Sequence, residues 1–178
     1  PLITASLLLS DTIFAQEYFQ QEVNYTISVK LDDERHELHG HGSFEYINNS
    51  PNTLTFLYIH LYPNAYSDHT TALGKQMLES RNTKLYYASE ADKGYIDSLN
   101  FLVGGKTVKW EYDSVHRDIC KLILNEPLPS KGKITVTTPF HVKIPKGVFS
   151  RMGHMGQAYQ ISQWYPKPAV YDKHGWTQ

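Results

Sequence analysis

The chain has 178 residues, with 17 basic and 18 acidic side chains, nine histidines and one cysteine. This length suits one domain, and the near-neutral charge gives no field that would attract nucleic acid as a partner. The single cysteine, Cys120, cannot form an internal disulfide. No segment is apolar for long enough to predict a transmembrane helix. Hydrophobic residues make up 40% of the chain and aromatic residues 13%, which is enough for a packed core.

The first sixteen residues are similar to the end of a secretory signal peptide. An apolar stretch leads to Ala15, a small residue where cleavage requires one. A short amphipathic helix is the alternative. We expect 1–16 to be a signal-peptide remnant and 17–178 to be the mature domain, which would then be secreted or periplasmic.

From Val23 onward the pattern predicts one strand after another. Apolar and polar residues alternate in 23–31 and again in 36–47, the period-two signature of a half-buried strand. Turn-forming residues crowd 48–52, and 54–61 is a third, more continuously apolar strand. Together these segments predict an antiparallel meander.

A polar stretch, 63–94, then interrupts the strands. It is rich in Ser, Thr and Asn, and only 71–79 has a weak helical pattern. It predicts one long excursion from the sheet, of a kind that is usually functional or interfacial. Further strands are predicted at 95–103, 106–112, 119–124 and 133–144. Pro139 in the last of them indicates an edge or a bulge, because proline has no N–H for the ladder. The predicted fold class is all-β and antiparallel.

The histidine-rich segment HELHGH, 36–41, does not contain the zinc motif of metallopeptidases. H-E-x-x-H requires two histidines one helical turn apart, but the position four after His36 is Gly40, and the alternation predicts a strand. His39 and His41 share a strand face and could chelate a metal, but the sequence shows no third ligand. Exposed histidines on a solvated face are therefore preferred, and no metal site is expected in this chain.

The other reactive residues have ordinary explanations. Asp32–Asp33 and the pair Glu90 and Asp92 lie in polar, turn-like surroundings, where carboxylates are normally solvated. Cys120 falls within a predicted strand, where a buried and inert thiol is the default. Composition and spacing alone show no catalytic centre.

Three segments together resemble a bacterial branch of the M1 family of zinc aminopeptidases. YTISVKLD (25–32) with HELHGHGSFEYINNS (36–50) resembles the opening of these enzymes. LYIHLYPNAY (57–66) looks like the segment that follows. YQISQWYPKPAVYDKHGW (159–176) is similar to a distinctive block near the end of the family's N-terminal domain.

The resemblance implies a saddle-shaped, sandwich-like antiparallel β domain that covers the cleft of a thermolysin-like catalytic domain. The family's zinc ligands, H-E-x-x-H with a later Glu, belong to that catalytic domain, so this chain alone would hold no zinc and be inactive. The whole enzyme would use zinc-activated water to remove N-terminal residues from peptides. Its β domain would have the C-terminal catalytic domain and peptide substrates as partners. In the family this domain usually lends one glutamine near the substrate amine, and Gln160 and Gln163 are the candidates, with Gln157 third.

Two alternatives remain open. One is a stand-alone secreted β-sandwich that binds carbohydrate or protein, with Trp164, Tyr165 and Trp176 as an open platform. On the aminopeptidase interpretation the same rings form an apolar patch against a partner domain, and we expect the protein to continue beyond Gln178. The other alternative is a domain from the family's non-catalytic relatives, which this sequence cannot separate from the enzyme.

Overall fold

The computed structural model describes residues 18–147 and 149–177, and the expected signal remnant, 1–16, lies outside them. Most of the long strands pair antiparallel with their neighbours, which confirms the predicted all-β, antiparallel fold. In the described ranges no helix has the length and apolar character needed to cross a membrane.

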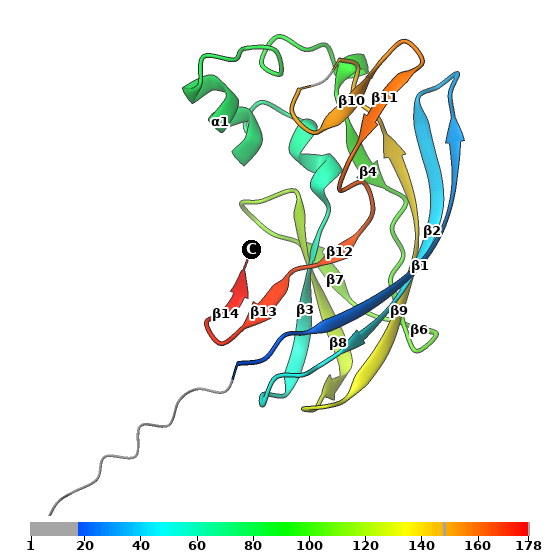
Figure 1. Cartoon of the computed structure of the whole chain (residues 1–178), viewed down its shortest axis with the longest axis vertical. Helices are drawn as coiled ribbons and strands as arrows, with labels where there is room; N and C mark the ends of the chain where they lie inside the picture. The colour runs from blue at the N-terminus through cyan, green and yellow to red at the C-terminus, as the bar shows by residue number, and fades with distance from the viewer. Residues whose placement is uncertain (1–17, 148, 178) are drawn as a thin grey trace, which may run out of the picture.

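The larger sheet has six strands in the order β1-β2-β9-β5-β6, with β4 also paired to β9. Its strands are β1 (Glu22–Asp32), β2 (Glu37–Ile47), β4 (Tyr95–Asp97), β5 (Leu102–Val103), β6 (Lys106–Thr107) and β9 (Lys133–Lys143). β1 and β2 form a hairpin, and β9 pairs along the whole length of β2. This three-stranded group, β1-β2-β9, is the long curved surface at the right of Figure 1.

The smaller sheet has four strands in the order β12-β3-β8-β7. Its strands are β3 (Leu54–His60), β7 (Trp110–Tyr112), β8 (Ile119–Leu128) and β12 (Lys167–Pro168). Two separate hairpins complete the described strands: β10 (Met152–Met155) with β11 (Ala158–Ile161), and β13 (Val170–Asp172) with β14 (Gly175–Thr177). In Figure 1 the first hairpin lies at the top of the larger sheet and the second lies beside β3.

One hydrophobic core joins the two sheets. It contains alternate residues of β2 and β9, such as Phe44 and Phe140, together with Leu57, Ile59 and Leu122 of the smaller sheet. Because successive residues of a strand point to opposite faces, the intervening residues of β2 and β9 lie on the outside of the larger sheet. Most of the polar side chains of these strands lie on that outer face.

The predicted meander of the first three strands is wrong at β3, which joins the smaller sheet instead of pairing with β2. The chain crosses from the larger sheet to the smaller one in the turn between β2 and β3. Asn48 is fully buried there, and its side-chain amide donates hydrogen bonds to the carbonyls of Asn52, Leu128 and Pro129. These bonds tie the turn to its own end and to the end of β8.

The strand expected at 95–103 is divided into β4 and β5, because the chain turns at Ser98, where the backbone φ is +59°. The strand expected at 106–112 is likewise divided, with β6 in the larger sheet and β7 in the smaller. Pro139 lies in β9, which has neighbours on both sides, and so does not mark an edge. It falls at the interval between β4, which pairs with 141–143, and β5, which pairs with 136–137. No neighbouring strand on that side requires an N–H there.

The polar stretch 63–94 folds into an ordered cap. It contains the 3₁₀ helices η1 (Tyr62–Tyr66) and η2 (Glu90–Asp92) and the helix α1 (Ala72–Glu79). Thr71 caps α1, because its side-chain oxygen accepts a hydrogen bond from the Gly74 N–H. The weak helical pattern at 71–79 therefore corresponds to α1 and its cap.

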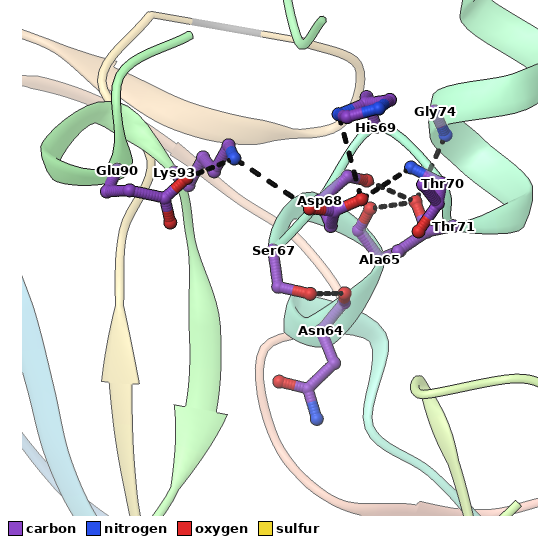
Figure 2. A network of polar contacts seen from close by, with 10 residues as sticks. All are labelled: Asn64, Ala65, Ser67, Asp68, His69, Thr70, Thr71, Gly74, Glu90 and Lys93. Atoms are coloured by element: carbon purple, nitrogen blue, oxygen red, sulfur yellow. Dashed lines mark hydrogen bonds and ion pairs between the residues drawn. The ribbon is translucent and has the colours of Figure 1, made fainter. Parts of the chain in front are cut away.

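Asp68 joins the two ends of this cap, as Figure 2 shows. Its carboxylate accepts a hydrogen bond from the Thr70 N–H at 2.7 Å, which lowers the pKa of the carboxyl group. The same carboxylate lies 3.9 Å from the ammonium of Lys93, a buried lysine that also bonds to Glu90. The beginning and the end of the stretch 63–94 are thereby joined by an ion pair.

Candidate functional site

The glutamines expected near a substrate amine lie in or beside the β10–β11 hairpin. Gln160 is exposed on β11, opposite Gly153 of β10. Gln163 follows β11 with a backbone φ of +55°, an uncommon conformation for a residue with a side chain. Gln157 lies in the hairpin turn, where its amide donates a hydrogen bond to the Asp33 carbonyl at 3.1 Å. The structure thus places Gln160 and Gln163 on one short segment and gives Gln157 an internal partner.

A cluster of three rings fixes this hairpin on the turn between β1 and β2. His36 and His154 stack with their ring centroids 3.6 Å apart and their planes 19° apart. His36 Nδ1 lies 2.7 Å from the hydroxyl of Tyr159 on β11. Burial, with a smaller contribution from His36, lowers the pKa of His154 and so favours its neutral form. Gln160 therefore lies on a hairpin that His36, in the turn between β1 and β2, holds in place.

The aromatic block near the end of the chain packs against this chain's own sheets. Its large rings, Trp164, Tyr165 and Trp176, are half-buried and contact the hydrophobic core. The rings of the two sheets that they contact are Tyr25 of β1, Phe140 of β9, and Phe56 and Tyr58 of β3. The block therefore lines the seam between the sheets, and only part of each ring is left for a partner.

The other reactive side chains hold turns or lie in the core. Asp32 accepts hydrogen bonds from the N–H groups of Arg35 and Glu34, and these bonds lower the pKa of its carboxyl. Burial raises the pKa of Cys120 to about 12, so its thiol stays protonated. A hollow of about 400 Å³ beside η1 has a single carboxylate in its lining, that of Asp113. That carboxylate accepts hydrogen bonds from two N–H groups of its own turn.

A second group of polar side chains lies on the outer face of the larger sheet. His39 of β2 lies directly opposite His141 of β9, and His141 lies opposite Asp97 of β4. Glu37 precedes His39 by two residues and so points to the same face. The side-chain ligand atoms of Glu37, His39 and His141 all lie within 4.8 Å of one another. His41 is not in this group.

Sequence reasoning missed two members of this group. Glu37 could have been found, because alternation places it on the same face as His39. His141 also occupies an outward position of a predicted strand, but nothing in the sequence says that this strand pairs with β2. The fold therefore brings two further candidate ligand side chains beside His39, and the expectation of a metal-free chain stays a prediction.

Comparison with known proteins assigns the chain to no family. No protein-family model matches the chain, and no curated protein is significantly similar to it. The resemblance to the M1 aminopeptidases therefore stays a prediction, carried by the residues of the three segments.

Proposed function

We propose that this chain is the N-terminal β domain of an M1-family zinc aminopeptidase, a secreted or periplasmic enzyme that removes N-terminal residues from peptides. The observation that carries the proposal is that the three segments resembling the family, 25–32 with 36–50, 57–66 and 159–176, adjoin in the fold, although the third is far from the other two in the sequence.

Specific contacts join these segments. The first and third meet through the rings of Tyr25 and Tyr165, 5.3 Å apart, and through the hydrogen bond between His36 and Tyr159. The second and third meet where β3 pairs with β12. The three likenesses therefore fall on one contiguous structural unit. Their adjacency supports a likeness between whole domains.

In this proposal the chain contributes binding, and the catalytic domain that follows it contributes the metal chemistry. In the family, zinc activates a water molecule and polarises the scissile carbonyl. The grouped His and Glu side chains of the described residues lie on β2 and β9 and do not fit the helical H-E-x-x-H arrangement. The zinc ligands would therefore belong to the catalytic domain. Gln160 or Gln163 would accept a hydrogen bond from the substrate ammonium through its amide oxygen.

The first test is to read the open reading frame beyond the codon for Gln178. We expect a G-x-M-E-N-like segment, then H-E-x-x-H with a downstream Glu. The encoded full-length protein is then assayed with aminoacyl p-nitroanilides, with and without a chelator. Chelator-sensitive release of p-nitroaniline is the expected result, and a stop codon or an unrelated following domain would overturn the proposal.

The glutamine assignment has its own test in the full-length enzyme. Loss of a hydrogen bond to a charged group costs about 1.5–3 kcal/mol, so the correct variant among Gln160→Ala and Gln163→Ala should lower kcat/KM about 10–100-fold. Gln76→Ala, at an exposed position of α1, is the matched control. If both variants behave as Gln76→Ala does, neither glutamine contacts the substrate.

The stand-alone binding domain has one feature in its favour. Tyr86 and Tyr87 are exposed neighbours on the cap, with ring centroids 5.0 Å apart, and such rings can pack on the apolar face of a sugar. A glycan-binding screen of the chain tests this alternative. Binding that is lost in Tyr87→Ala and kept in Tyr112→Ala, another exposed tyrosine, would favour it over the aminopeptidase.

A further inference from the structure

Three adjacent strands place His39, His141 and Asp97 side by side on the outer face of the larger sheet. Directly opposed residues of antiparallel strands have Cβ atoms about 4.5–5.5 Å apart, so the register alone brings these side chains within reach. The imidazole rings of His39 and His141 stack, with centroids 4.9 Å apart and planes 26° apart. The Glu37 Oε2 atom lies 3.4 Å from Nε2 of His141 and 3.5 Å from Nε2 of His39.

The two ring nitrogens of His141 have different surroundings. Nδ1 lies 2.8 Å from the Asp97 carboxylate, which accepts a hydrogen bond and so places the proton of a neutral ring on Nδ1. Nε2 is buried and has no hydrogen-bond partner among the described residues. The lone pair of Nε2 then points into the space that it shares with Glu37 and His39. A histidine whose other nitrogen donates to a carboxylate is the usual arrangement of a metal ligand.

The spacing of the three ligand atoms fits a small divalent ion. Zinc binds imidazole nitrogen and carboxylate oxygen at about 2.0–2.2 Å, and a tetrahedron of that size has edges of about 3.3–3.6 Å. The two distances from Glu37, 3.4 and 3.5 Å, already have this length. The His39 side chain is 52% exposed and is free to turn toward the ion. Closing the group around an ion would require this side chain to turn.

We propose that Glu37, His39 and His141 form a binding site for a divalent transition-metal ion, with zinc as the preferred ion. Two imidazoles and one carboxylate suit zinc and its neighbours in the first transition row, whereas magnesium and calcium prefer oxygen ligands. Asp97 is the positioning residue, because it fixes the tautomer and the orientation of His141. The bound ion would link β2 to β9, and its fourth position would face solvent. All four residues belong to this chain, so the proposal does not depend on the aminopeptidase proposal.

Titration of the metal-free chain with zinc chloride tests the site. The full chain, carrying a purification tag without histidines, is stripped with a chelator and titrated by calorimetry, and one ion per chain is expected. Cobalt(II) is titrated in parallel, since its visible absorption reports coordination by nitrogen and oxygen. Glu37→Gln and His39→Asn each remove one ligand and should weaken binding at least tenfold.

Two further variants separate a metal site from a surface cluster. Asp97→Ala keeps all three ligands and removes the carboxylate that accepts the hydrogen bond from His141 Nδ1, so zinc affinity should fall roughly 10–100-fold. His41→Asn is the matched control, since His41 is exposed on the same face of β2 and lies outside the group. Its affinity for zinc should equal that of the wild type.

Two results would overturn the proposal. One is the absence of stoichiometric zinc binding by the folded wild type, and the other is equal affinity in the wild type and in His39→Asn. Either would mean that the group is a polar surface cluster that does not hold a metal ion. Because His39 is largely exposed, its variant should keep the native circular dichroism spectrum, so that lost binding reports the site and not the fold.

Discussion

The two faces of the β2–β9 pair are built from alternate residues of the same strands, yet they have opposite properties. On the inner face Gly40 lies opposite Phe140, which is 2% exposed and belongs to the core. One residue earlier on β2 and one later on β9, His39 faces His141 on the outer face. The inner face is covered by the close-packed core, whereas the outer face is accessible to solvent and to ligands. Stability and binding should therefore respond to different residues of the same two strands.

The largest expected effect is on the inner face, with Phe140→Ala. The ring of Phe140 lies across Gly40 and contacts Trp164, so its removal leaves a cavity that glycines cannot fill. The free energy of unfolding should fall by about 3–5 kcal/mol, measured by urea denaturation followed by circular dichroism. A loss below about 1 kcal/mol would contradict a core that is continuous beneath β2 and β9.

Two glycines of β2 give a sharper test of the same face. A Cβ atom on Gly40 would lie 2.3 Å from Cζ of Phe140, whereas one on Gly42 would lie 3.6 Å from the nearest atom of that ring. Gly40→Ala should therefore destabilise by about 1–3 kcal/mol, the usual range for overpacking. Gly42→Ala should be neutral or stabilise by about 0.5–1 kcal/mol, because glycine weakens a strand interior. Equal effects of the two substitutions on the urea midpoint would refute the role given to Phe140.

Tyr46 is a polar exception on the inner face. It is fully buried, its hydroxyl has no hydrogen-bond partner in the described part of the chain, and burial raises its pKa. Removing an unsatisfied buried group relieves a desolvation cost, so Tyr46→Phe should raise the free energy of unfolding by about 1 kcal/mol. The thermal midpoint should rise with it. A fall in the midpoint would show that the hydroxyl is satisfied by a buried water.

The alternation of β2 was enough to assign its two faces from the sequence. It places Gly40 and Gly42 on one face and His39 and His41 on the other, as the structure does. It could not say why a glycine occupies position 40, because the ring that excludes a larger side chain there comes from β9. His141, the residue that faces His39, is likewise the neighbour of Phe140 on β9. Periodicity is local, whereas strand pairing and register depend on the whole fold.

The breaks in the strands were missed for a related reason. Ser98 adopts a positive φ, although its neighbours continue an apolar and polar alternation that favours a strand. Its turn separates β4 from β5, and it is β4 that brings Asp97 beside His141. The glutamine candidates came from the resemblance alone, and no local pattern in 157–163 places them on a hairpin held by His36. Both candidate sites thus rest on long-range contacts.

The smallest effect expected is on the outer face, with Glu45→Gln. Glu45 lies 3.1 Å from Lys133 of β9, whose side chain is 67% exposed. An exposed ion pair contributes about 0–1 kcal/mol and is screened by salt, so the substitution should lower the free energy of unfolding by less than about 0.5 kcal/mol. The difference from wild type should vanish in 1 M salt, because the screening length there is only about 3 Å. Zinc affinity should not change, since Glu45 lies outside the group formed by Glu37, His39 and His141. A loss as large as that of Gly40→Ala, persisting in salt, would mean that the outer face also carries stability and that the two faces are not divided as proposed.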